Sequence, residues 1–280
     1  MTTPGPDVAP LGPDSLTWRL GFRRTALLLA GRALIMQTAH PTVGAGVRDF
    51  SNFRADPWGR LDRTVTSLQA QLFGGPDSIR EAQRLREMHE SITGTGFVGE
   101  PYRALSPEAW AWVHLSNFDS AAVFVDLFVR PLTDAERERM YAEYRQVGRV
   151  LGIRDEDMPP DVPALRVYVA DMIESRLAPS VTTDDLLETM SLHDVAPPYR
   201  LFPPPLWAAL RPAGRYLLRD ASVGTLPPRL RDKLGLTWTD AQQRRLLRLA
   251  AVVRRADPAV PARLLHYPAG YQAVRAARAR

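Results

Sequence analysis

The sequence predicts an all-α protein in which several helices form a bundle within one domain. Three observations favour this class. Apolar residues recur with the helical period along most of the chain, the alternation typical of strands is nearly absent, and helix start and stop signals bound the periodic segments. With 280 residues, of which 45% are hydrophobic and 24% charged, the chain is long enough to bury a large core.

Composition excludes several kinds of chemistry. The chain has no cysteine, so disulfides, thiolate metal sites, iron–sulfur clusters and a cysteine nucleophile are all absent. The net charge is +5, and Lys233 is the only lysine among the 36 basic residues. Because the arginines are interleaved with 31 acidic residues, this charge does not by itself indicate a nucleic-acid partner.

The first segments are an arm and a buried helix. Residues 1–14 are rich in proline and lack a basic n-region, so we expect a disordered arm and not a signal peptide. The most apolar stretch, Thr25 to Ala39, is interrupted by Arg32 and is too short to span a bilayer. We therefore expect a buried helix there, a second short helix from about Val43 to Phe50, and a cytoplasmic protein.

A longer helix should run from about Pro57 to Phe73. Asp56 is a typical N-cap with proline after it, and Gly74 and Gly75 are a stop signal. Beside its apolar face lies a row of polar side chains: Arg60, Arg63, Thr64, Ser67 and Gln71. This row is either a solvated flank of the helix or a set of hydrogen-bond donors that line a cavity.

The next helix should start near Asp77 or Ser78 and end by Gly94. Its apolar stripe consists of Ile79, Ala82, Leu85, Met88 and Ile92, and His89 falls within that stripe. His89 is therefore expected to point toward the core, either as a buried hydrogen-bonded side chain or as a ligand.

The glycines from Gly94 to Gly99 match the spacing of a dinucleotide-binding fingerprint, and Asp119 lies at a suitable distance. We reject that interpretation. The fingerprint requires a strand before the glycines and a helix directly after them, whereas here a helix precedes them and Pro101 follows. A glycine loop between helices is the expected structure.

Ser106 and Pro107 should start a helix that Pro131 ends. One broad face of this helix is apolar except for His114 and Asn117. Buried polar side chains need partners, so these two either satisfy each other and the nearby backbone or face a ligand cavity.

The remaining helices follow from their caps. We expect helices from Thr133 to about Leu151, from Pro163 to Leu177 after the cap Asp161, near Leu186 after the cap Thr182, and from Thr239 or Asp240 to about Ala256. The proline-rich segment from Ala196 should cross the surface within the same domain, with Phe202, Leu206 and Trp207 contributing to the core. Residues 15–265 would then form the domain, and residues 266–280 a C-terminal tail.

Standard catalytic patterns are missing. Neither Glu-x-x-His, nor His-x-x-x-His, nor Gly-x-Ser-x-Gly occurs. One metal chemistry still fits a chain with few histidines and no cysteine: a macrocycle that brings four ligands of its own and needs only an axial histidine. The apolar stripe around His89 suits that need.

A series of short motifs resembles one known family. The motifs are Gly31-Arg32 with Gln37-x-x-His40-Pro41, Asp56-Pro57-x-Gly59-Arg60-Leu61-x-Arg63-Thr64, His89-x-x-Ile92-x-Gly94, Tyr102-x-Ala104 and Trp112-Val113-His114. Their order is similar to that in the catalytic domain shared by the latex-clearing rubber oxygenases and the oxygenase of mycophenolic-acid biosynthesis. The resemblance extends from about Gly21 to Gly235.

The resemblance implies an all-helical haem-oxygenase-like catalytic domain with a buried pocket that holds haem b and its iron. By this resemblance His89 is the axial iron ligand, and His114, His40 and Asn117 lie near the haem. Arg60, Arg63 and Thr64 match a distal catalytic cluster whose second member is a lysine able to bind iron. Since a guanidinium stays protonated, we expect Arg63 to donate hydrogen bonds to oxygen or to a haem propionate instead.

The resulting hypothesis is a haem b-dependent oxygenase that acts with dioxygen on an apolar, unsaturated small molecule. We expect no nucleic-acid partner and no transmembrane segment, and a homodimer is one assembly that the protein could form. Two alternatives remain open. One is a haem carrier or sensor without oxygenase activity, and the other is a non-catalytic basic helical protein that binds a partner through its arginine-rich C-terminal part. The haem hypotheses require a cavity of porphyrin size beside His89.

Overall fold

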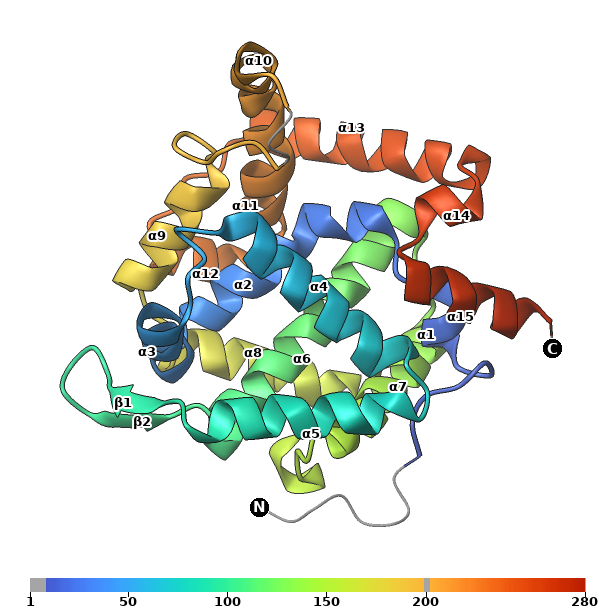
Figure 1. The fold of residues 1–280 in the computed structure, drawn as a ribbon, viewed down its shortest axis with the longest axis horizontal. Helices are drawn as coiled ribbons and strands as arrows, with labels where there is room; N and C mark the ends of the chain where they lie inside the picture. Colours follow the sequence, from blue (N-terminus) through green and yellow to red (C-terminus); the bar gives the residue numbers. More distant parts are fainter. Residues whose placement is uncertain (1–8, 199–201, 280) are drawn as a thin grey trace.

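The computed structural model describes residues 9–198 and 202–279, and it is an all-α domain (Figure 1). The α-helices are α1 (Leu16–Leu20), α2 (Ala30–Thr38), α3 (Pro41–Phe50), α4 (Pro57–Phe73), α5 (Asp77–Glu90), α6 (Pro107–Phe124), α7 (Asp134–Val150), α8 (Val162–Ser175), α9 (Val181–Met190), α10 (Pro204–Arg215), α11 (Ala221–Thr225), α12 (Pro228–Lys233), α13 (Asp240–Ala256), α14 (Ala262–Leu265) and α15 (Pro268–Arg278). Strands β1 (Thr93–Thr95) and β2 (Pro101–Arg103) form a small hairpin. Among the described residues, no helix combines the length and apolarity that crossing a bilayer requires.

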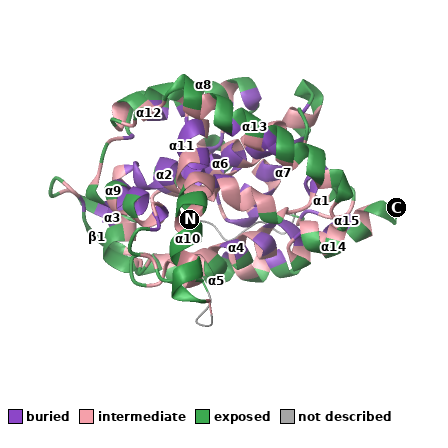
Figure 2. Cartoon of the chain, turned by 90° about the horizontal axis from the view of Figure 1, so that it is seen from above, coloured by how far each residue is buried: buried purple, intermediate pink, exposed green. Residues whose placement is uncertain are grey.

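Helix α6 lies at the centre of the bundle. It contacts α2, α3 and α7, and Figure 2 colours much of it as buried. The prediction of one apolar face is too narrow, because Trp112, Leu115 and Phe118 are also buried away from that face. A helix surrounded by other helices needs apolar residues on every side. The helix continues as a π-helical turn from Val125 to Val129 before Pro131.

Helices α4 and α5 form an antiparallel hairpin with the predicted bounds. The Asp56 carboxylate accepts a hydrogen bond from the Gly59 amide at 2.9 Å, which confirms the N-cap of α4. Gly75 has a positive φ of 54°, a conformation that glycine adopts without strain, and it reverses the chain before Asp77.

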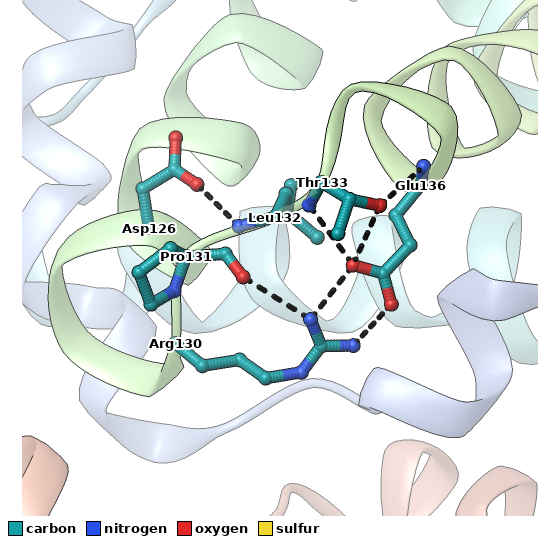
Figure 3. A network of polar contacts seen from close by, with 6 residues as sticks. All are labelled: Asp126, Arg130, Pro131, Leu132, Thr133 and Glu136. Carbon is teal, nitrogen blue, oxygen red and sulfur yellow. Dashed lines mark hydrogen bonds and ion pairs between the residues drawn. The ribbon is translucent and has the colours of Figure 1, made fainter.

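The cap of α7 is confirmed in full (Figure 3). Thr133 Oγ1 accepts a hydrogen bond from the Glu136 amide at 3.2 Å, and the Glu136 carboxylate accepts one from the Thr133 amide at 3.0 Å. Arg130 pairs with the same carboxylate, and the Asp126 carboxylate accepts from the Leu132 amide. The turn between the π-helical segment and α7 is therefore held by side chains from both.

Two local predictions are wrong. Thr182 is not a cap, because Ser180 Oγ accepts the Thr183 amide while the Thr182 hydroxyl is buried and donates to the Gly44 carbonyl. The stretch Thr25–Ala39 is not one helix, since a 3₁₀ helix from Arg24 to Leu29 precedes α2. The predicted start of α6 at Ser106 and Pro107 is confirmed, although the Ser106 side chain makes no capping bond.

One segment expected to be a loop is ordered by strand pairing. The glycine segment after α5 forms the β1–β2 hairpin, in which Thr93 faces Arg103 and Gly99 adopts a φ of 92° in the turn. A strand of three residues is too short to show alternation, so the periodicity did not reveal it.

Both ends of the described chain are more ordered than the predicted arm and tail. Residues 1–8 lie outside the described residues, but Leu11 is buried, so residues 9–14 lie on the domain. The tail contains α15, which packs Ala273 and Val274 into the core against α1. At α10 the expectation that Leu206 belongs to the core is wrong, because this side chain is 47% exposed, whereas Phe202 and Trp207 are partly buried and pack on each other.

Candidate active site

A cavity of about 1070 Å³ is enclosed mainly by α2, α4, α5, α6 and the 3₁₀ segment before α2. This volume is at the upper end of the roughly 300–1,000 Å³ range of small-molecule and cofactor pockets. The predicted polar row of α4 lines it in full: Arg60, Arg63, Thr64, Ser67 and Gln71. Of the two interpretations of that row, the cavity-lining one is therefore correct.

His89 lines this cavity from the last turn of α5. Its Nδ1 lies 2.7 Å from the Leu85 carbonyl, so Nδ1–H donates and Nε2 carries the lone pair. Nε2 makes no hydrogen bond with any described residue. Burial lowers the pKa of His89 and the charges of Arg60 and Arg84 lower it further, against the opposing effect of the Leu85 hydrogen bond. The lowered pKa favours the neutral imidazole, in which Nε2 is the nitrogen without a hydrogen-bond partner among the described residues.

The indole of Trp110 packs against the imidazole of His89. The two ring centroids are 5.1 Å apart at an interplanar angle of 63°, an edge-to-face contact. Trp110 Nε1 donates to the Leu151 carbonyl at 3.1 Å, which fixes the indole in turn. Sequence reasoning placed Trp110 only on an apolar face; its contact with His89 joins α6 to α5, and no local pattern signals such a pairing.

Arg60 brings a half-buried positive charge to the cavity wall. Its Nη1 donates to Thr64 Oγ1 at 2.5 Å and its Nε to Ser51 Oγ at 3.3 Å, but no carboxylate among the described residues pairs with it. Partial burial, and secondarily the charge of Arg63, lowers the pKa of Arg60. A half-buried guanidinium without a carboxylate partner is a site at which an anion or a developing negative charge is stabilised.

Arg63 is placed differently from Arg60. Its side chain is 54% exposed, and its guanidinium binds the Asp56 carboxylate at 3.2 Å and Asn52 Oδ1 at 3.0 Å. Arg63 reaches the edge of the cavity. Its N–H groups, however, are bonded to Asp56 and Asn52 at the start of α4.

A second polar cluster joins α4 to α5 along the cavity. Ser67 Oγ donates to Glu81 at 2.5 Å, Gln71 donates to Ser67, and Arg84 pairs with the same Glu81 carboxylate. Sequence reasoning missed Glu81. The signal was available in the spacing from the Gly74–Gly75 turn. Arg60 and His89 are equally far from it, and so are Ser67 and Glu81 to within one residue; an antiparallel hairpin pairs such positions.

His114 and Asn117 line the same cavity without contacting each other. His114 Nε2–H donates to the Tyr144 carbonyl at 2.7 Å, and burial lowers its pKa to about 4. Asn117 Oδ1 accepts from Gln37 Nε2 at 3.1 Å. Both of the alternatives stated for this pair therefore hold in part: each side chain has a hydrogen-bond partner, and each also faces the cavity.

His40 is not brought to the cavity. It lies buried just before α3, where its Nε2 is 3.3 Å from Glu108 Oε1 and its Nδ1 has no partner among the described residues. Burial lowers its pKa, although Glu108 opposes that effect.

The donor set indicates which cofactor the cavity could hold. Within residues 9–198 and 202–279, no group of three or more His, Asp or Glu side chains is arranged to bind a bare metal ion. A porphyrin needs only one protein ligand, and a metal-binding imidazole usually donates its other N–H to a carbonyl or carboxylate. His89, with its Nδ1–H on Leu85 and its Nε2 free, fits that requirement.

Comparison with known proteins identifies the family of the chain. The model of the family described as "ER-bound oxygenase mpaB/B'/Rubber oxygenase, catalytic domain" matches residues 18–255. Uncharacterized proteins of Mycobacterium bovis and Mycobacterium tuberculosis are each 28% identical over 243 residues, which cover 85% of this chain and 91% of the relative. No solved structure matches significantly.

Proposed function

The chain belongs to the catalytic-domain family of the mpaB and rubber oxygenases, and on this premise we propose that it is a haem b-dependent oxygenase. Its substrates would be dioxygen and an apolar, unsaturated small molecule. In the reaction we favour, both atoms of dioxygen enter the products and the C=C bond breaks to give two carbonyl groups, so that no external reductant is consumed. An alternative reaction within the same proposal is a related oxygenation of the same class of substrate, without cleavage of the C=C bond.

The observation that carries the proposal is the environment of His89. Its ring lines a cavity of about 1070 Å³ and has one nitrogen without a hydrogen bond to a described residue, and two contacts, the Leu85 carbonyl and the Trp110 ring, restrain the ring plane. An unpartnered nitrogen alone does not mark a ligand, since the buried His40 and His266 each have one. Of these three histidines, His89 is the one that lines the cavity. We assign His89 as the axial ligand of the haem iron.

When bound, haem would supply the iron centre at which dioxygen is activated. The chain itself would contribute charge and shape. Arg60, braced by Thr64 and lacking a carboxylate partner, is suited to stabilise negative charge that develops on oxygen. Aliphatic and aromatic side chains of α4 and α6, among them Leu61, Val65 and Phe124, would bind the apolar substrate and exclude water.

The other predicted site residues have smaller roles in this proposal. Arg63 would bind an acidic group of the cofactor at the cavity edge only after releasing Asp56 or Asn52. His114 and Asn117 would present neutral polar groups to the cofactor or substrate. His40 would act from outside the cavity, through the turn into α3. A cytoplasmic location and a homodimer also remain predictions.

The decisive experiment compares haem binding by the wild-type protein and His89→Ala after expression with haem supplementation. We expect an intense Soret absorption band in the wild type, and its loss in His89→Ala, because the axial ligand is removed. Arg60→Ala is the matched control: it alters the same cavity, but it should keep the Soret band and lose oxygen uptake with candidate alkenes.

Each alternative function has its own outcome in this experiment. A Soret band that is unchanged in His89→Ala would overturn the ligand assignment. A wild-type protein that binds haem but consumes no oxygen with any alkene would support the carrier or sensor. A colourless wild-type protein after supplementation would favour the non-catalytic interaction protein.

A further inference from the structure

Helix α13 carries a row of arginines that lack partners. Five are exposed, and none forms an ion pair or hydrogen bond with a described residue: Arg244, Arg245, Arg248, Arg254 and Arg255. Arginines elsewhere on the surface are often paired, as Arg130 is with Glu136 and Arg229 with Glu174. The charge on α13 is therefore uncompensated.

Exposed aliphatic side chains accompany these arginines. At 100° per residue, Arg244, Arg248 and Arg255 lie within about 40° of one another on the side opposite the buried Leu246. On either side of that line lie Leu247, which is 48% exposed, and Val252, which is 64% exposed. Exposed basic and aliphatic side chains together match the two chemistries of a membrane surface, anionic headgroups and apolar acyl chains.

Helix α10 adds an apolar stripe beside α13. Leu206 and Leu210, one turn apart, are 47% and 44% exposed, and none of the helix's residues is buried. Arg211 and Arg215 of α10 and Arg245 of α13 line one cleft of about 950 Å³ together with Glu188 and Asp220, so the two helices flank the same hollow, in which the arginines outnumber the acids. Figure 1 places both along one edge of the molecule, and Figure 2 looks onto that edge.

We propose that the surface formed by α10 and α13, here called the α10–α13 surface, docks on an anionic phospholipid bilayer. The arginines of α13 and of the cleft would bind lipid phosphates, and Leu206 and Leu210 would enter the headgroup–acyl boundary. This proposal does not rest on the proposed function. It would, however, place the domain where apolar molecules accumulate.

Two other occupants fit less well. A second copy of the chain would bring its own unpaired arginines onto the same face, and like charges repel. Nucleic acid would use the arginines but would leave exposed leucines without a counterpart, since its phosphate backbone offers no apolar layer.

The test measures binding of the full chain to vesicles by co-sedimentation, with phosphatidylcholine alone or mixed with phosphatidylglycerol. We expect binding only to the mixed vesicles, and weaker binding as salt rises. Arg244→Gln/Arg248→Gln should lower the partition coefficient roughly tenfold or more. Leu206→Ser/Leu210→Ser should lower it by a similar, roughly tenfold, factor because the apolar contact is lost.

The matched control is Arg103→Gln/Arg166→Gln. It removes the same net charge from two exposed arginines whose side chains have no hydrogen-bond or ion-pair partner among the described residues, on β2 and α8, which lie away from α10 and α13 in Figure 1. It should change the partition coefficient by less than about threefold. Equal losses in both arginine variants, an unchanged partition in the leucine variant, or binding to a DNA duplex but not to vesicles would each overturn the proposal. Circular dichroism of every variant confirms that folding is retained.

Discussion

At the scale of single residues, burial decides the chemistry of the histidines. His114 is enclosed by α6 and α7, where its Nε2–H binds the Tyr144 carbonyl and burial lowers its pKa to about 4. The role of Asp119 is likewise decided by the side chains around it. The glycine fingerprint would have made it a ribose ligand, but it forms an ion pair of 2.6 Å with the buried Arg32.

Neutral His114 should make stability depend on pH. Its pKa is lower in the folded chain than the ordinary 6.5, so the unfolded chain takes up the proton first as the pH falls. The free energy of unfolding should therefore decrease as the pH falls from about 6.5 to about 4, by up to roughly 3 kcal/mol from this residue.

His114→Gln tests this contribution, because an amide can still donate to the Tyr144 carbonyl but does not titrate between pH 4 and 7. Urea denaturation across that range should give a shallower pH dependence for the variant than for the wild type. Parallel curves for the two proteins would contradict the assignment.

At the scale of elements, helix caps determine where the helices begin. The hairpin of α4 and α5 has the predicted bounds because Asp56 satisfies a free amide and two glycines stop the helix. The same hairpin brings Arg60 and Thr64 onto one cavity with His89. The α4–α5 hairpin is thus the element that builds the candidate site.

Two N-cap positions with similar sequences should respond differently to alanine. Thr133→Ala removes a hydroxyl that accepts the Glu136 amide, and it should lower the free energy of unfolding by about 1 kcal/mol. Ser106→Ala is the matched control, because the Ser106 side chain makes no capping bond, and its effect should be within about 0.5 kcal/mol. Equal destabilisation of both variants in urea denaturation would show that the hydroxyl bond at α7 contributes nothing.

At the scale of the whole molecule, the first and last described helices, α1 and α15, meet. Helix α15 packs on α1, and Glu143 of α7 accepts the first amides of α1, from Leu16 at 2.6 Å and Thr17 at 2.8 Å. The carboxylate at the start of a helix satisfies amides that would otherwise lack partners. The C-terminal segment is therefore part of the domain.

Substitutions in α15 should reveal this packing. Val274→Asp places a carboxylate in a buried position and should lower the free energy of unfolding by at least about 2 kcal/mol. Gln272→Asp, at an exposed position two residues earlier, should have little effect. A thermal melt in which Val274→Asp matches the wild type would mean that α15 is not docked in solution.

The sequence by itself determined the helical class, most helix bounds and the polar row of α4, because caps, glycine stops and apolar periodicity act over a few neighbouring residues. It also indicated His89, although only with the family motifs in hand. It could not place His40 outside the cavity or bring Trp110 against His89, and it could not distinguish a docked α15 from a tail. Those outcomes depend on which helices meet in space, since burial and long-range contacts are properties of the packed bundle and not of any one segment.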